Sequence, residues 1–436
     1  MNPYPSRLAV SVALVALMVH LPVARAAGEP PPDKTADPQA EKPAPAPPPE
    51  KKVAPATAGA DGFAIQSENG DYRLQFRAYF HFDGRFYPGV DRALAVDTFI
   101  VRRARPIFAG TVAKYFDFLI MPDFSQGTTT LFDAWVEFNS SSKARVRIGK
   151  FKSPVGLERL QSAMTTAFVE RAFPTALVPN RDVGVQLYGD LDGGVVSYAV
   201  GLFDGAPDGG NIDLDLNDGK DVAGRIFICP FKKGSSVLKN LGLGIGGTYG
   251  QQSGALPAYR SGGQLSILTL VSGITADGAR TRYSPQLSFY SGPFGLMAEY
   301  AHSESRVLQA ATSEHAELVA RAWQTTATVT LTGDTASYNG VRPRKPFDPP
   351  TGQWGAVELA ARVNGLEVQG AAVSEGLIDP TRSVRKAFAW AVGLNWYLNR
   401  NVKEVLDYER TTFTGGTAGG DRPAENALFF RTQLSF

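Results

Sequence analysis

Apolar and polar residues alternate along the segment that follows Asp71. The alternation has a period of two over twelve residues, which predicts a β-strand with one apolar face and one polar, partly charged face. The apolar face comprises Tyr72, Leu74, Phe76, Ala78, Phe80 and Phe82, and the polar face comprises Arg73, Gln75, Arg77, Tyr79, His81 and Asp83. A soluble sheet would place the polar face in water. A membrane barrel would place the apolar face against lipid and the polar face in its lumen.

The last ten residues show the same pattern and end on an aromatic residue. Leu428, Phe430, Thr432, Leu434 and Phe436 share one parity, and the residues between them are mixed. A strand that closes an outer-membrane barrel shows its apolar side to lipid and ends paired, because unpaired backbone groups in hydrocarbon cost several kcal/mol. A terminal Phe is typical of bacterial outer-membrane proteins. Taken alone, the segment fits the last strand of a soluble sheet equally well.

Weaker alternation recurs along the rest of the chain. In one row, Phe132, Val136 and Phe138 are predicted to face lipid, away from Asp133 and Glu137. Counting such rows predicts sixteen strands if residues 354–368 form one strand, and an even number places both chain ends on the periplasmic side.

Short and long connections alternate between these strands, as expected of periplasmic turns and outer loops. The predicted turns are residues 140–143, 191–194, 291–293 and 399–400. The predicted long loops are residues 152–182, 204–220, 251–281, 303–318, 371–384 and 414–425. Residues 333–353 are an exception, because they form a long connection where a short turn is expected.

The amino terminus favours the membrane interpretation. Arg7 precedes an apolar run from Leu8 to Val23, and Ala24-Arg25-Ala26 has the pattern of a signal-peptidase site. We therefore expect residues 1–26 to be a signal peptide rather than a retained anchor. Residues 27–60 are rich in Pro and Ala and are expected to form an extended periplasmic linker, and residues 61–436 are expected to form the barrel.

Composition and net charge exclude some classes of protein. A single cysteine, Cys229, allows no intrachain disulfide. Removal of Arg7 and Arg25 with the signal peptide leaves 42 basic and 42 acidic residues, which argues against a nucleic-acid-binding protein. Any preference for ions of one sign must therefore come from the positions of the charges.

Strand parity indicates which charges face the lumen. Arginines predicted to do so are Arg73, Arg77, Arg145 and Arg147, together with Arg103 and Arg105 if Ile100, Ala104 and Phe108 face lipid. Arg102 would then lie near a rim or extend its side chain toward water. Acidic residues predicted to face inward, on strands between those bearing the arginines, are Asp117, Asp123, Asp133 and Glu137. Opposed charges of this kind could orient a solute, or could simply neutralise a polar lumen.

Two other classes of barrel remain as alternatives. An enzymatic barrel would need a catalytic constellation, and His81 beside Asp83 is the best candidate. No Gly-x-Ser-x-Gly elbow and no paired His motif for a metal occurs, so we expect no enzyme, metal or cofactor. A purely structural or adhesive barrel would have a plugged lumen and carry no ion current.

Several segments together resemble the phosphate-selective porin O and P family, and the resemblance covers residues 71–436. The segments that carry it are residues 99–105 (FIVRRAR), 147–158 (RIGKFKSPVGLE), 168–171 (FVER), 354–362 (WGAVELAAR) and 393–399 (GLNWYLN). The resemblance implies a transmembrane antiparallel β-barrel of about sixteen strands, usually a homotrimer, whose third loop folds into the pore. It also implies the long connection before Trp354.

The resemblance implies as well a pore lined by arginines, with lysines at its constriction. Basic residues in or beside the third loop are Lys150, Lys152, Arg159, Arg171 and Arg181, and a further lumen candidate is Arg225. Unlike the family pattern, Glu158, Glu170 and Asp182 are interleaved with them. We therefore expect an outer-membrane porin for small anions such as phosphate or polyphosphate, with a general or cation-preferring porin as the alternative.

Overall fold

The computed structural model describes residues 56–214 and 217–436. The predicted signal peptide and most of the predicted linker lie outside the described residues. Within these ranges, no helix is long and apolar enough to cross a membrane.

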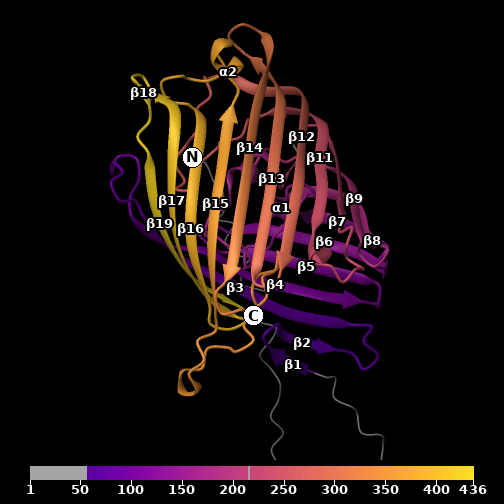
Figure 1. Cartoon of the computed structure of the whole chain (residues 1–436). Helices are drawn as coiled ribbons and strands as arrows, with labels where there is room; N and C mark the ends of the chain where they lie inside the picture. The colour runs from indigo at the N-terminus through magenta and orange to yellow at the C-terminus, as the bar shows by residue number, and fades with distance from the viewer. Residues whose placement is uncertain (1–55, 215–216) are drawn as a thin grey trace, which may run out of the picture. The chain divides into compact units, whose positions relative to one another are not determined.

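Sixteen antiparallel strands of the described chain close into a barrel, which confirms the predicted fold class (Figure 1). Closure is made by the first and last barrel strands, where Leu428 pairs with Phe86 and Ser435 pairs with Tyr79. The barrel strands are β3 (Arg73–Phe86), β4 (Thr98–Val112), β5 (Phe116–Asp123), β6 (Thr130–Ser141), β7 (Ala144–Phe151), β8 (Asp182–Leu191), β9 (Val196–Phe203), β10 (Asp221–Ile228), β11 (Gly242–Gly254), β12 (Ile274–Ser291), β13 (Phe294–Gln309), β14 (Glu314–Thr330), β15 (Ala356–Val368), β16 (Val384–Tyr397), β17 (Val402–Thr417) and β19 (Glu425–Ser435).

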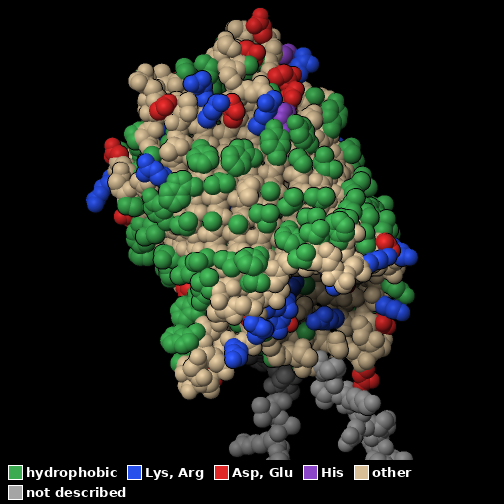
Figure 2. Space-filling model, in the orientation of Figure 1, with side chains coloured by type: hydrophobic (Ala, Val, Ile, Leu, Met, Phe, Trp, Pro, Cys, Tyr) green, Lys and Arg blue, Asp and Glu red, His purple; other side chains and the backbone are tan. Residues whose placement is uncertain are grey.

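The outward face of the barrel is apolar and the inward face is polar. On β3, Phe80 and Phe82 are 42% and 46% exposed, whereas His81 and Asp83 on the opposite face are fully buried. On β19, Phe429 is buried inward and Phe430 is outward. Figure 2 shows a broad hydrophobic band over the outer wall. The predicted direction of polarity is therefore confirmed for the first and last strands, as a barrel in lipid requires.

The predicted short turns and the long connection at residues 333–353 are present, since β14 ends at Thr330 and β15 begins at Ala356. The prediction of a long loop at residues 303–318 was wrong, because β13 continues to Gln309 and β14 already begins at Glu314. Both faces of a strand that rises above the membrane are wetted, so the apolar alternation stops before the strand does. The loop predicted at residues 251–281 is shorter for the same reason, and spans residues 255–273.

Two β-bulges change which side chains enter the lumen. On β4, His81 pairs with Arg103 and Phe82 pairs with Val101, which leaves Arg102 as the extra residue. Parity is reset at the bulge, so Val101 faces outward and Ile100 pairs with the inward Asp83. The prediction that Ile100 faces lipid was therefore wrong.

The second bulge lies on β6. Met121 pairs with Asp133 and Pro122 pairs with Leu131, which leaves Phe132 unpaired. The ring of Phe132 lies against inward guanidinium groups instead of facing lipid as predicted.

The barrel wall has unequal height. β5, β7, β9 and β10 have 8 residues each, whereas β12, β13, β14 and β17 have 16 to 18. A strand needs roughly 9 to 11 residues to cross the bilayer. The strands of the tall side exceed this length, whereas the 8-residue strands of the short side fall below it.

A short hairpin continues the wall below the last strand. β1 (Ala56–Gly59) pairs with β2 (Gly62–Gln66), and β2 pairs with the start of β3, where Phe63 lies opposite Phe76. The terminal ring of Phe436 packs at 5.8 Å from the ring of Phe63. The residues from Ala56 onward, which the linker prediction included, therefore form a strand.

The remaining elements are short. They are α1 (Leu157–Leu160), η1 (Phe173–Leu177), η2 (Val237–Asn240), η3 (Pro349–Thr351), α2 (Ala371–Ser374) and β18 (Gly420–Asp421). Both α1 and η1 belong to the connection between β7 and β8, which lies inside the barrel.

Candidate functional site: a basic passage beside the third loop

Residues 152–181, here called the third loop, pack against one side of the barrel interior. Val155, Phe173 and Leu177 of the loop are buried in one cluster with alanines of β13, β14 and β16, namely Ala301, Ala320, Ala322, Ala387 and Ala389. The small side chains leave room for the loop, so this half of the lumen is filled by an apolar core.

Side chains of the tall wall hold the backbone of the third loop in place. Glu299 accepts a hydrogen bond from the Glu158 amide at 2.8 Å, and Asp407 accepts one from the Val169 amide at 2.6 Å. Arg362 donates to the Glu170 carbonyl at 2.9 Å and forms an ion pair with Glu409 at 2.7 Å. Further contacts come from Asn364, Asn395, Lys403 and Gln433. These bonds fix the loop as a rigid partition.

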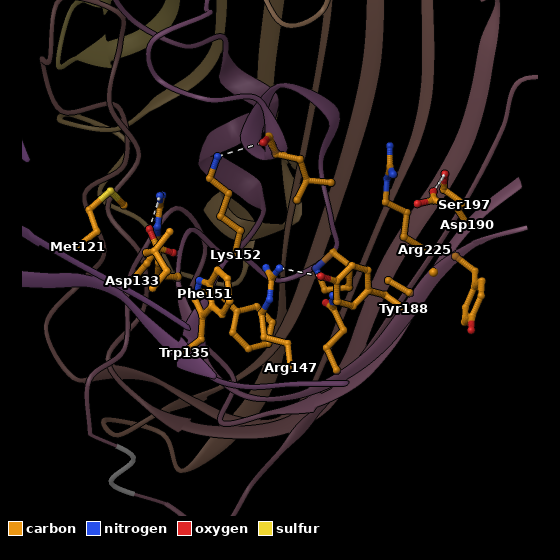
Figure 3. Close-up of a pocket in the computed structure, with 18 residues that line it drawn as sticks. Met121, Asp133, Trp135, Arg147, Phe151, Lys152, Tyr188, Asp190, Ser197 and Arg225 are labelled. Carbon is orange, nitrogen blue, oxygen red and sulfur yellow. Dashed lines mark hydrogen bonds and ion pairs between the residues drawn. The ribbon is translucent and has the colours of Figure 1, made fainter. Parts of the chain in front are cut away.

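The space left beside the loop consists of two cavities. The outer cavity, of about 510 Å³, lies under the outer loops and is lined by residues such as Arg102, Arg103, Arg105, Phe132, Arg159, Glu170, Arg171, Asp208 and Arg260. The inner cavity, of about 480 Å³, extends toward the periplasmic turns and is lined by residues such as Trp135, Arg147, Phe151, Tyr188, Asp190 and Arg225 (Figure 3). Lys152 and Arg181 line both cavities, so they mark the passage between them.

Eight basic and two acidic residues line the outer cavity. The acidic residue Glu170 is bonded by Arg85 at 2.6 Å and lies 3.5 Å from Arg102. Burial by itself would raise the pKa of Glu170, but Arg102, Arg85 and Arg103 lower it to about 2. Glu170 is therefore a charged anion already matched by its neighbours.

Three arginines of the lumen form ion pairs with acidic side chains. Arg105 pairs with Asp123 at 2.7 Å, Arg147 with Glu137 at 2.6 Å, and Arg181 with Asp133 at 3.2 Å. Aromatic rings orient the same groups: the guanidinium carbons of Arg105 and Arg181 lie 3.5 and 4.4 Å from the centre of the Phe132 ring, and Arg147 lies 4.1 Å from Trp135. These arginines are fixed in position by contacts on more than one side.

A second group of cations has no carboxylate within ion-pairing distance among the described residues. This group, here called the unpaired cations, comprises Arg103, Lys152, Arg159, Arg171 and Arg225. Their hydrogen-bond partners are neutral: His81 for Arg103, Gln286 for Arg225, and backbone carbonyls of the third loop for the other three. The unpaired cations leave the passage with an excess of positive charge.

The pKa values of two cations in the third loop, Lys152 and Arg159, are lowered. Burial, followed by Arg181 and Arg171, lowers the pKa of Lys152 well below its usual value. Burial and the same neighbouring guanidinium groups lower the pKa of Arg159 to about 9. Burial is the larger cause of both shifts, and the neighbouring guanidinium groups add to it.

Not all predicted residues meet at the two cavities. Arg73 is exposed at the periplasmic rim, and Arg77 lies in a separate cavity of about 190 Å³ at the periplasmic mouth. Arg145 lies 3.5 Å from Asp190, and Lys150 pairs with Asp213 of the loop at residues 204–220. Asp117 accepts hydrogen bonds from Thr111 and Asn139 rather than from a basic side chain.

Sequence reasoning missed Arg102 and Arg85. Arg102 lines the outer cavity because of the bulge, which parity cannot reveal. Arg85 shares the parity of Asp83, so extending the first alternating row by two residues would have found it. The described residues contain no group of three His, Cys, Asp or Glu side chains that could hold a metal ion.

Comparison with known families agrees with this architecture. A family model described as phosphate-selective porin O and P matches residues 73–436. The chain belongs to this family. It is an outer-membrane porin of a bacterium, built as a channel rather than as an enzyme. No curated protein sequence matches the chain.

Solved porin structures share the fold at low sequence identity. The outer-membrane channel DcaP of Acinetobacter baumannii aligns with a TM-score of 0.55 and 10% identity, covering 87% of this chain and 100% of that one. An anion-selective porin from Comamonas acidovorans aligns at 0.53 and 11% identity, covering 84% and 100%. The trimer form of OmpT from Vibrio cholerae aligns at 0.53 and 12% identity, covering 84% and 99%. At these identities the likeness concerns the fold alone.

Proposed function

We propose that this porin conducts small anions passively and prefers them to cations. The observation that carries the proposal is the group of unpaired cations along the two cavities. Each carboxylate near the passage already bonds a basic or polar partner, whereas Lys152, Arg159 and Arg171 point only at neutral carbonyls. A permeating anion would supply the missing charge.

The arrangement suits transit better than retention. Conduction requires sites strong enough to attract an ion and weak enough to release it. Here the third loop limits the width, and the cations follow one another from the outer cavity through Lys152 and Arg181 to Arg147 and Arg225. A solute can exchange one set of donors for the next without a deep energy minimum.

Oxyanions fit this lining for a geometric reason. The guanidinium group is planar and offers several donors that match two oxygens at once. We therefore place phosphate and related oxyanions among the permeating solutes. The match to a family described as phosphate-selective supports this proposal.

The test is electrical recording from purified protein in a planar bilayer. A reversal potential measured across a KCl gradient should have the sign of chloride preference, and addition of phosphate should reduce the chloride current. A cation preference would refute the proposal and make the lumen aspartates the dominant charges. A membrane that stays closed would favour a structural barrel.

We also propose that the barrel works as a homotrimer in which the short wall is the subunit interface. The 8-residue strands β5, β7, β9 and β10 are too short to span lipid, yet they carry outward Ile120, Ile148 and Val200. A neighbouring subunit would cover them. Mass measurement of the unheated, detergent-solubilised protein should give three chains, and a monomer would refute this. We keep as a separate proposal that the Pro-rich segment, most of which lies outside the described residues, is periplasmic.

A further inference from the structure

A groove on the outer surface of the tall wall has no role in the passage. It has a volume of about 460 Å³ and crosses the outward faces of β13 to β17 near their outer-loop ends. It is here called the wall groove, and its lining includes Arg321, Trp323, Gly365, Glu367, Lys386 and Phe388.

Strand register builds the groove as two rows. In the lower row Trp323 lies opposite Gly365, which lies opposite Phe388. Because Gly365 has no side chain, the rings of Trp323 and Phe388 approach to 6.3 Å above it. A Cβ atom at Gly365 would lie only 2.8 Å from the indole nitrogen, so glycine keeps the groove open.

The upper row carries charge. Arg321 lies opposite Glu367, which lies opposite Lys386, and Lys386 pairs with Glu367 at 3.0 Å. Within the described chain Arg321 has no ion pair or hydrogen bond, and the indole N–H of Trp323 has no acceptor. One positive charge and one donor are therefore left at the groove without a partner.

The groove lies where the membrane meets water. Aromatic side chains gather at membrane interfaces, and Figure 2 shows Lys and Arg side chains, interspersed with Asp and Glu, along the upper margin of the hydrophobic band on the face where β13 to β17 lie in Figure 1. A cation at this depth is stabilised by an anionic headgroup. The strands of the tall wall are also long enough to cross the bilayer, so this surface is open to lipid.

We propose that the wall groove binds one phosphorylated lipid of the outer leaflet. The lipid phosphate accepts hydrogen bonds from Arg321, Lys386 and the indole N–H of Trp323. An acyl chain lies along the rings of Trp323 and Phe388 over Gly365. This role is independent of anion conduction, because the groove faces away from the lumen.

The experiment titrates the folded, detergent-solubilised protein with lipid A, a bis-phosphorylated glycolipid, and counts bound lipid by native mass spectrometry. Arg321→Gln with Lys386→Gln should weaken retention on the order of tenfold or more. Gly365→Ala should also weaken it, because the displaced indole blocks the groove without changing charge. The matched control is Lys345→Gln with Arg382→Gln, which removes two exposed charges away from the groove and should retain lipid A as the wild type does.

Two further arms separate lipid from free anion. Dephosphorylated lipid A should bind weakly to the wild type, and inorganic phosphate should not displace lipid A at equal concentration. Equal retention of lipid A by wild type and the Arg321 and Lys386 variant would overturn the proposal, as would displacement by inorganic phosphate. The reversal potential of that variant should stay at the wild-type value, so failure here is distinct from failure of the proposed anion channel.

Discussion

Lys152 offers the sharpest test of the passage. Its amino group donates to the carbonyls of Leu160 and Gln161 at 3.1 and 2.8 Å, and it lines both cavities without a carboxylate partner in the described chain. The substitution Lys152→Gln removes one positive charge at the junction and keeps a side-chain donor for the loop. Lys152→Arg preserves the charge.

The size of the effect follows from Coulomb's law. An anion about 5 Å from a unit charge gains ~0.8 kcal/mol at the dielectric constant of water and ~3 kcal/mol at an effective value of about 20, and a cation loses the same amount. Even the smaller energy, ~0.8 kcal/mol gained by the anion and ~0.8 kcal/mol lost by the cation, changes the ratio of anion to cation permeability on the order of tenfold.

The assay is the reversal potential in a KCl gradient at low salt, where the Debye length is roughly 10 Å or more and screening is weak. Lys152→Gln should lower anion preference, Lys152→Arg should retain it, and the effect should shrink as salt rises. The control is Lys233→Gln, because Lys233 is 64% exposed on a periplasmic connection and pairs with Asp192. Lys152→Gln with the wild-type reversal potential, or an equal shift in the Lys233 control, would refute the assignment of the passage.

Three further outcomes are expected. Burial and neighbouring cations lower the pKa of Lys152, so its amino group loses the proton at a pH below the usual lysine value of 10.5. Anion preference should therefore fall as the pH rises through this lowered pKa, and the Lys152→Gln variant should show no such fall. Arg362→Gln leaves the Glu409 carboxylate buried without its partner, which costs roughly 3–5 kcal/mol of stability. The variant should therefore have a lower melting temperature. Its current should also be noisier, because the third loop loses a bond that holds it. Phe132→Leu removes two cation–π contacts of about 0.5–2 kcal/mol each, and should reduce anion preference without changing net charge, while Phe138→Leu on the lipid face should not.

Much of the architecture could be predicted from the sequence. Alternation with a period of two fixes which face of β3 and β19 meets lipid, because side chains on a pleated strand point to opposite sides without exception unless the pleat is broken. Turn length then gives the order and direction of neighbouring strands. The long connection before Trp354 is an exception to the turn pattern, and only the resemblance to the porin family implied it. The pairing of Phe86 with Leu428 is known from the structure alone.

Parity failed where the pleat is broken. The bulges at Arg102 and Phe132 each insert one residue into a strand pair. They turn the guanidinium group of Arg102 and the ring of Phe132 toward the lumen, where the alternation of side chains did not place them. A bulge depends on how two neighbouring strands pair, so a single strand carries no signal of it.

The sequence by itself determined that this chain alternates like a membrane barrel and carries basic residues on its inward faces. Only the tertiary structure decided which of those charges matter. Arg181 and Asp133 are distant along the chain and neutralise one another in space, whereas Lys152 and Arg171 meet only carbonyl groups. Electrostatic energy depends on distance and surroundings in space, and a linear sequence specifies neither.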